Sequence, residues 1–504
     1  MNVLRINYFV LAALGGAFAV AGFAPWNIYP MPVLSLALLF WLWGQTASPR
    51  ASAWLGFAFG LGMFGAGVGW IYVALHDYGN MPMVLALFTT LLFAAFLALF
   101  PALVGYLQAK ISLPGWMRQT LLLPALWVAV ELLRGYLFTG FPWLAMGYAQ
   151  VPGSPLAGYA PILGVYGVSL VAAISAGLLV MFVQQRWSAR GKLAATMLLV
   201  LWLGGAALRM VEWTVPEGAP VKVSLLQGNI AQDEKFEEGR LVGTLETYRR
   251  LALGSDARLI VFPETAVPLL RGEMPENYAD ILREHARRND GDILIGAFEQ
   301  ERNLYYNSMF SLGVSPAQAY RKNHMVPFGE FIPLRPLFGW LINEVLNIPM
   351  GDLASGGAQQ PLLNLAGQRI AMNICYEDVF GEEIIRALPQ ATLLLNVSND
   401  AWYGDSSAAM QHNQIAQMRA LETGRMMLRA TNTGVTSVIG SDGRVLQMLP
   451  QHEEGVLTAQ VQGYAGATPY VRWGNAAVMG LVLAMLVLAW SRRIRASTGE
   501  GSNE

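Results

Sequence analysis

The sequence predicts an α-helical transmembrane bundle of eight spans joined to an α/β domain outside the membrane. Hydrophobic residues make up 54% of the 504 residues and charged residues only 13%, a composition typical of membrane proteins. The first 214 residues carry few charges, whereas residues 215–470 have the mixed composition of a soluble domain. Strand-like and helix-like stretches alternate in that second part, which favours an α/β fold.

A spanning helix needs roughly 20 apolar residues. Eight candidates lie near 6–23, 31–46, 53–75, 83–107, 119–138, 161–184, 193–211 and 474–491. We therefore expect four parts: a seven-span domain (1–214), an α/β domain (215–470), an eighth span (471–495) and a tail (496–504). The N-terminus also fits a signal peptide, but six further spans favour a retained first helix.

Lys and Arg in the short loops predict the orientation. They gather on one side of the bundle, at Arg5, Arg50, Lys110, Arg118, Arg186, Arg190, Lys192, Arg492, Arg493 and Arg495. The opposite loops, near 24–30, 76–82 and 139–160, contain neither residue. We expect both termini in the cytoplasm and the α/β domain in the periplasm, with the chain in the inner membrane. The net charge of −1 gives no attraction to nucleic acid.

Some residues within the spans need a separate interpretation. Residues 60–65 fit a dinucleotide-binding pattern, but no strand precedes them, and the spacings Gly56/Gly60 and Gly65/Gly69 instead predict close helix packing. Glu131 and Arg134 lie on one face of the fifth span and form either a structural ion pair or a contact to a lipid head group. Trp143 belongs either to an aromatic belt at the membrane interface or to a lipid portal.

The α/β domain is predicted to contain a mixed sheet. Strand candidates are Val221–Ile230, Leu259–Pro263, Ile293–Phe298, Tyr305–Leu312, Arg369–Ile374, Leu393–Val397 and Val435–Ile439. Helical stretches lie near 240–254, 276–288 and 408–429. Open α/β sheets place active sites just past strand ends, where this sequence has Glu264, Lys322 and Cys375.

Cys375 is the only cysteine of the chain, and its position at a strand tip favours a nucleophile over an inert core thiol. Attack requires the thiolate, which Glu264 could generate as a base. Lys322 and the N–H of Tyr376 could stabilise an oxyanion, and Glu330 could orient Lys322 or the amine acceptor. His324 offers an alternative Cys–His pair. The five histidines lack metal-ligand spacing, which argues against zinc.

Three motifs occur in the order found in the Glu-Lys-Cys enzymes of the nitrilase (carbon–nitrogen hydrolase) superfamily. They are Pro263-Glu264, Tyr320-Arg321-Lys322-Asn323-His324 and Asn373-Ile374-Cys375-Tyr376-Glu377. The spans, Gly140–Trp143, Gln227–Asn229 and Val326–Glu330 extend the resemblance to the membrane-bound N-acyltransferase branch of that superfamily over nearly the whole chain.

The resemblance implies a nitrilase-like αββα sandwich on an eight-helix base. It also implies Cys375 as nucleophile, Glu264 as general base and Lys322 as the group stabilising the tetrahedral intermediate, with Glu330 and Glu377 as supporting carboxylates. The donor would be a phospholipid, typically phosphatidylethanolamine, whose sn-1 acyl chain forms a thioester. The acceptor would be the α-amino group of a diacylglyceryl-cysteine at a lipoprotein N-terminus. We expect no cofactor and a monomer.

One residue departs from the family pattern, because Phe236 stands where a tryptophan is expected in the arm that covers the site. The aromatic wall is kept, and an indole N–H contact is lost. Two alternative functions remain open. A membrane-tethered amidase would transfer the acyl group to water, and a transporter or receptor would not depend on Glu264, Lys322 or Cys375.

Overall fold

The computed structural model describes residues 3–333 and 352–498, so most of the predicted tail, 496–504, lies outside the described residues. The chain divides into two compact units. The helical unit comprises Met1–Tyr72, Met83–Glu212 and Arg472–Glu504, and the α/β unit comprises Val73–Pro82 and Trp213–Val471. The sequence assigned residues 73–82 to the end of a span and its following loop, whereas here they group with the α/β unit.

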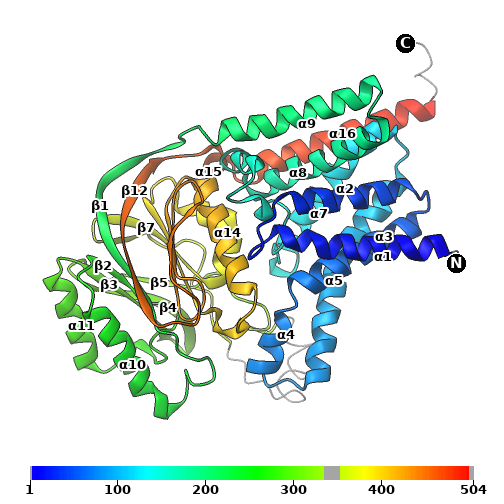
Figure 1. Cartoon of the computed structure of the whole chain (residues 1–504). Helices are drawn as coiled ribbons and strands as arrows, with labels where there is room; N and C mark the ends of the chain where they lie inside the picture. Colours follow the sequence, from blue (N-terminus) through cyan, green and yellow to red (C-terminus); the bar gives the residue numbers. More distant parts are fainter. Residues whose placement is uncertain (1–2, 334–351, 499–504) are drawn as a thin grey trace. The chain divides into compact units, whose positions relative to one another are not determined.

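The helical unit is built from apolar helices (Figure 1). Its main helices are α1 (Val3–Ala19), α2 (Pro30–Gly44), α3 (Pro49–Gly67), α5 (Met83–Lys110), α7 (Leu123–Tyr136), α8 (Ala160–Gln185), α9 (Ala189–Leu208) and α16 (Ala476–Thr498). Shorter turns are η1 (Val20–Gly22), α4 (Ile71–Val73), α6 (Gly115–Met117), η3 (Arg118–Leu122), η4 (Leu137–Thr139), η5 (Tyr148–Gln150) and η6 (Pro155–Tyr159). All eight predicted span positions are helical.

Not all of these helices have the length of a membrane span. Among the described residues, four helical segments are long and apolar enough to span a membrane: Met83–Lys110, Gly115–Thr139, Pro155–Gln185 and Ala189–Leu208. A fifth candidate, Pro49–Gly67 with Ile71–Tyr78, is bent by 59°. Shorter apolar helices cover Asn7–Gly22, Pro30–Gly44 and Ala476–Arg492. Eight spans therefore remain a prediction.

The sequence predicted close helix packing at two glycine pairs, and the structure shows it at the first pair, Gly56 and Gly60. A Cβ on Gly56 would collide with the carbonyl oxygen of Pro101, and one on Gly60 would lie 2.6 Å from Cα of Ala98. Both glycines therefore allow α3 to approach α5. The prediction for Gly65/Gly69 is wrong, because α3 ends at Gly67 and a Cβ on Gly65 would meet nothing within 4 Å.

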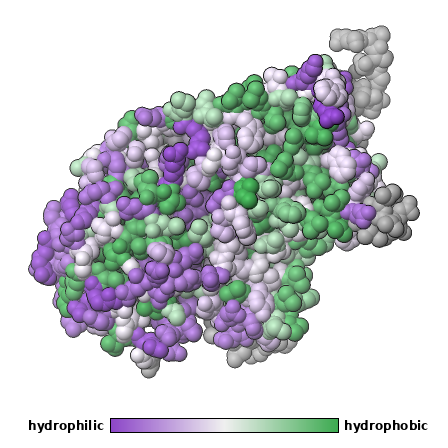
Figure 2. Space-filling model, in the orientation of Figure 1, coloured by the Kyte–Doolittle hydropathy of each residue, from purple (hydrophilic) through white to green (hydrophobic). Residues whose placement is uncertain are grey.

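The helical unit exposes large apolar side chains, as expected for helices that contact lipid. Val84 and Leu92 on α5, Leu199 and Leu203 on α9, and Leu483 on α16 are all more than half exposed. Figure 2 shows hydrophobic residues on the visible surface of these helices.

The α/β unit contains two sheets, each of six strands among the described residues. The first has the order β12-β1-β2-β3-β4-β5 and the second β11-β10-β9-β8-β7-β6. The strands are β1 (Thr214–Gln227), β2 (Leu259–Val261), β3 (Asp292–Glu301), β4 (Leu304–Gly313), β5 (Ala319–Arg321), β6 (Leu363–Leu365), β7 (Gln368–Ile374), β8 (Leu393–Ser398), β9 (Met427–Thr431), β10 (Ser437–Ile439), β11 (Val445–Met448) and β12 (Gly455–Gly466).

Helices cover the outer face of each sheet. They are α10 (Glu238–Leu253), α11 (Glu276–Arg288) and α14 (Ala408–Thr423). Separate short elements are η2 (Ala74–Tyr78), η7 (Arg271–Glu273), η9 (Cys375–Val379), α13 (Gly381–Ile384), η10 (Ile385–Ala387), η11 (Asp400–Tyr403) and α15 (Pro469–Trp473). The first sheet packs on α10 and α11 through Ile260 and Ile293, and the second packs on α14 through Leu394 and Met427.

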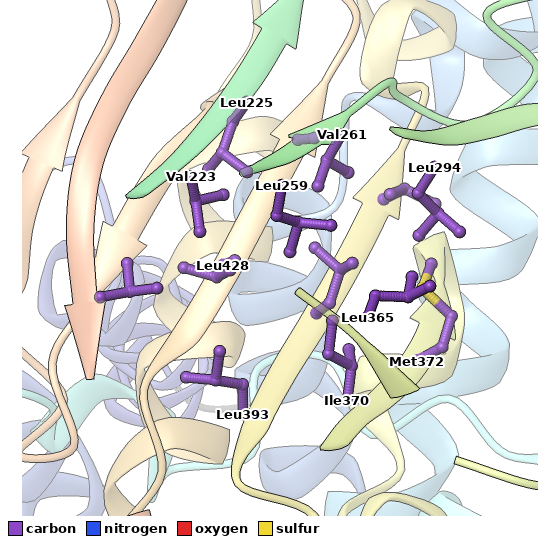
Figure 3. Packing of buried hydrophobic residues seen from close by; sticks show 14 of the residues in the cluster. Val223, Leu225, Leu259, Val261, Leu294, Leu365, Ile370, Met372, Leu393 and Leu428 are labelled. Carbon is purple, nitrogen blue, oxygen red and sulfur yellow. The ribbon is translucent and has the colours of Figure 1, made fainter. Parts of the chain in front are cut away.

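The two sheets face each other across a dry core. Val223 and Leu259 of the first sheet and Ile370, Leu393 and Leu428 of the second belong to one buried cluster, and Figure 3 shows side chains from the two sheets pointing toward one another. The layer order is thus helix, sheet, sheet, helix, as expected from the resemblance. Burial of alternate residues on each strand drives this stacking.

The sequence predicted the central strands better than the edge strands. The predicted helix 408–429 is too long, because Gly424 ends α14 in a left-handed conformation with φ of 64° and the chain then forms β9. β5, β6, β9, β11 and β12 were not predicted. β12 had a readable signal, since its buried Leu457, Ala459 and Val461 alternate with more exposed residues.

Candidate active site

The three predicted catalytic residues lie just past the carboxyl ends of strands. Glu264 follows β2, Lys322 follows β5 and Cys375 follows β7. Cys375 has a positive φ of 52° and Thr265, beside Glu264, has one of 46°. Residues with side chains rarely adopt this conformation, and strained residues cluster at functional sites. At Cys375 the chain turns sharply from β7 into η9 and thereby displays the thiol.

The Lys322 ammonium is held between two carboxylates in the interior. Its side chain is 1% exposed, and Nζ lies 2.8 Å from Glu330 Oε1 and 3.4 Å from Glu264 Oε1. Burial opposes the charge, but the two carboxylates outweigh it and raise the pKa of Lys322 well above its ordinary value. Lys322 is therefore a fixed cation, and Glu330 orients it.

Both carboxylate oxygens of Glu264 are fixed by donors from other strands. Asn307 Nδ2 donates to Oε1 over 2.7 Å, and the backbone N–H of Asn399 donates to Oε2 over 2.9 Å. Sequence reasoning missed both asparagines. Asn399 follows the apolar strand β8 and so had the same signal as Glu264, whereas Asn307 lies within β4 and had none.

The Cys375 thiol is half-buried, and its surroundings disfavour the thiolate. Burial and the nearby Glu264 carboxylate raise the pKa of the thiol well above its ordinary value, and Lys322 offsets only part of this increase. A thiol in this state needs a base at the moment of attack. Glu264 is the carboxylate that acts most strongly on it.

Glu377 ties the loop after β5 to the turn that carries the thiol. Its Oε2 accepts the N–H of Ile374 over 2.6 Å, and its Oε1 accepts the N–H groups of Asn323 (2.6 Å) and His324 (3.1 Å). The Tyr320 hydroxyl donates to the same carboxylate. Burial raises the pKa of Glu377 to about 7, although the hydrogen bonds from the backbone act to lower it. This carboxylate therefore holds the two segments together.

The contacts of His324 do not favour a Cys–His pair. Its Nδ1 lies 3.1 Å from Glu383 Oε1, and its ring stacks on Phe380 with centroids 3.7 Å apart. In residues 3–333 and 352–498, no cluster of three or more His, Cys, Asp or Glu side chains is arranged to hold a metal ion.

A buried charge cage of four residues, His412, Arg429, Asp378 and Asp400, lies beside Cys375 and was missed by sequence reasoning. His412 Nδ1 is 3.0 Å from Asp400 Oδ1, and Nε2 is 2.8 Å from Asp378 Oδ1. Arg429 bonds the other oxygens of the same two carboxylates, at 2.9 Å to Asp378 and 3.3 Å to Asp400. Each side chain is at most 3% exposed.

The cage predicts that stability falls at alkaline pH. Burial and Arg429 oppose protonation, but Asp378 and Asp400 outweigh them and raise the pKa of His412 from 6.5 to about 9. Protonated His412 thus stabilises the fold fully below pH 6.5, and this stabilisation, about 3 kcal/mol, is lost as the pH rises through 9. We expect the thermal midpoint of wild type to exceed that of His412→Gln at pH 6, and we expect this difference to be smaller at pH 9.5. A difference in thermal midpoint that stays constant over this pH range would contradict the prediction.

A second buried lysine lies next to Glu264, and an apolar cavity is lined in part by the segment that follows it in sequence. Lys235 Nζ donates to Thr265 Oγ1 over 2.6 Å and to the Glu264 carbonyl oxygen over 3.3 Å, and burial lowers the pKa of Lys235 to about 8. The neighbouring Phe236 is 56% exposed. It lines a cavity of about 530 Å³ with Leu270, Tyr305 and other mainly apolar residues.

The predicted site residues of the helical unit are buried and hold a loop. Glu131 Oε1 accepts the indole N–H of Trp127 over 2.9 Å and the N–H of Met146 over 3.0 Å. Arg134 donates to the carbonyl oxygen of Trp143 over 2.5 Å. Trp143 itself is only 4% exposed. These contacts favour the structural interpretation of Glu131 and Arg134, and they place the Trp143 ring in the interior.

Comparison with known proteins divides the chain into two matched regions. Residues 15–178 match the apolipoprotein N-acyltransferase N-terminal domain, and residues 222–470 match the carbon-nitrogen hydrolase family. The chain is 53% identical to the apolipoprotein N-acyltransferase of Nitrosomonas europaea, over 94% of this chain and 95% of the relative. It is 44% identical to that of Methylococcus capsulatus, over 98% of both chains, and 45% identical to that of Ralstonia nicotianae, over 96% and 94%.

Proposed function

Because the chain belongs to the apolipoprotein N-acyltransferase family, we propose that it N-acylates lipoproteins through a thioester on Cys375. The acyl donor is a phospholipid that gives up its sn-1 chain, with phosphatidylethanolamine as the typical donor. The acceptor is the α-amino group of an N-terminal diacylglyceryl-cysteine. The observation that carries the proposal is the burial of Lys322 between Glu264 and Glu330, with Glu264 and Lys322 as the two charged groups that act most strongly on the Cys375 thiol.

In the first half-reaction, Glu264 takes the thiol proton and the Cys375 thiolate attacks the sn-1 ester carbonyl. The C–S bond forms, and the negative charge on the carbonyl oxygen is stabilised by Lys322 and the N–H of Tyr376. The ester C–O bond then breaks, and Glu264 returns its proton to the departing lysophospholipid oxygen. The product of this step is an acyl thioester on Cys375.

In the second half-reaction, the lipoprotein amine attacks the thioester carbonyl while Glu264 takes a proton from the nitrogen. The C–N bond forms, the C–S bond breaks, and the proton passes from Glu264 to the Cys375 sulfur. One carboxylate thus serves as base and then as acid in each half-reaction. A ping-pong route suits a site that must accept two bulky lipid substrates in turn.

The cavity beside Phe236 supports a role in substrate binding. Its volume of about 530 Å³ lies in the range of small-molecule sites. Leu269 and Leu270, which line it, belong to the segment that follows Glu264, so acyl chains held here would lie near the base. We assign Phe236 to the apolar wall of the lipid site and give Trp143 no direct contact with substrate.

We also propose the membrane topology expected from the sequence. The domains are 1–214, 215–470, 471–495 and 496–504, with eight spans and both termini in the cytoplasm of an inner-membrane protein. The short apolar helices and the bent pair at Pro49–Tyr78 would supply the four further spans. The α/β domain then faces the periplasm, and the enzyme acts as a monomer.

Intact mass spectrometry of the protein purified from membranes tests the proposed function. We expect a fraction of the enzyme to carry one acyl chain on Cys375, removable by hydroxylamine and absent in Cys375→Ala. Transfer of the label to a diacylglyceryl peptide supports the acyltransferase, whereas release only as free fatty acid would indicate the amidase. Full activity in Cys375→Ala with no adduct would refute the thioester route.

A further inference from the structure

The carbonyl oxygen of Cys375 receives two side-chain donors from the layer behind the nucleophile. Asn396 Nδ2 donates to it over 3.0 Å, and His412 Nε2 lies 3.3 Å from it. Asn396 is fully buried and is itself held, because Arg429 donates to its Oδ1 over 2.9 Å. The charge cage therefore reaches the backbone of Cys375 through this carbonyl oxygen.

We propose that His412 and Asn396 are positioning residues for the reaction at Cys375, acting through the Cys375 carbonyl. By holding this oxygen they fix the peptide group between Cys375 and Tyr376. That group sets the left-handed backbone that displays the thiol, and such a conformation persists only where its surroundings fix it. This inference rests on the proposed function, in which Cys375 is the nucleophile.

The same peptide group carries the N–H of Tyr376, the proposed oxyanion donor. A carbonyl that accepts hydrogen bonds polarises its amide, which strengthens the N–H as a donor. A donor with positive charge has a larger effect than a neutral one, and both ring nitrogens of His412 face carboxylate oxygens, which keeps the imidazole charged. His412 and Asn396 thus prepare the site for developing negative charge without touching the substrate.

Two amide substitutions of His412 separate this hydrogen bond from the charge of the cage. Gln reaches the position of His Nε2 and can still donate to the Cys375 carbonyl, whereas Asn reaches only the position of Nδ1. Both remove the imidazolium and leave the same buried carboxylates. The experiment follows the burst of Cys375 acylation by a phospholipid labelled in its acyl chain, in the full-length enzyme. The burst amplitude reports the competent fraction, and the burst rate reports positioning.

We expect His412→Asn to lower the burst rate about tenfold or more and His412→Gln to recover about threefold or more of that loss. Asn413→Ala is the matched control, because Asn413 is the next residue of α14, is equally buried and bonds Ser437. A loss of folding alone would lower its burst amplitude and leave its burst rate unchanged. Equal rates in the His412→Asn and His412→Gln enzymes, or a wild-type rate in His412→Asn, would overturn the inference.

Asn396→Ala provides an independent test if the two His412 variants have no burst amplitude. It removes the other donor to the same carbonyl, so its burst rate should also fall about tenfold, and an unchanged rate would overturn the inference. The wild-type burst separates the two proposals. If wild type forms no adduct on Cys375, the proposed function fails, whereas a wild-type adduct with unaffected variants refutes only the positioning role.

Discussion

Replacing Glu264 with Gln is expected to slow acylation of Cys375 by about 10²- to 10⁴-fold. Gln keeps the size and shape of the side chain, but it cannot take the thiol proton. The raised pKa of Cys375 disfavours the thiolate, so the thiol itself does not compensate for the loss of the base. The measurement is the single-turnover rate of thioester formation from labelled phospholipid.

The pH dependence of the variant gives a second and sharper measurement. Without a base, attack depends on thiolate formed by solvent, so the rate in Glu264→Gln should rise steadily with pH through the alkaline range. Glu246→Gln is the control, because Glu246 lies on the surface of α10, paired with Arg249, and its rate should match wild type. A Glu264→Gln enzyme that acylates at the wild-type rate at pH 7 would exclude Glu264 as the base.

The proposed catalytic residues were predicted from the three family motifs, and Glu264 and Cys375 also come after apolar strands. Glu264 follows β2 of the first sheet and Cys375 follows β7 of the second, whereas Lys322 follows β5, which was not predicted. Asn399 follows β8 in the same way and could have been found by the same argument. Glu377 was predicted as a supporting carboxylate from the resemblance, and the structure adds that it bonds backbone N–H groups of two separate segments.

The charge cage could not be predicted because its members carry no local pattern. Asp378 and Asp400 follow different strands, His412 lies on a helix that is buried throughout, and Arg429 lies within β9. An arginine within a strand is ordinarily a surface residue. Its burial becomes understandable only when two carboxylates from other segments are placed against it. The prediction that 408–429 is one helix also hid β9, and with it the position of Arg429.

Replacing Lys322 with Met should affect both catalysis and folding, and the two effects can be separated. Removal of one oxyanion donor lowers the acylation rate by about 10²- to 10³-fold. The change also leaves Glu264 and Glu330 buried without the cation between them. Breaking a buried ion pair in this way costs about 3–5 kcal/mol, which a lower thermal midpoint would show.

The double variant Lys322→Met/Glu330→Gln distinguishes the two contributions. Glu330→Gln removes one of the two carboxylate charges left without a cation, so part of the lost stability should return, while acylation stays as slow as in Lys322→Met. Lys222→Met is the control, because Lys222 pairs with Asp256 on the surface and should change neither property. Recovery of activity together with stability would mean that Lys322 serves only the fold. A double variant that regains stability but not activity would mean that the Lys322 ammonium takes part in the reaction itself.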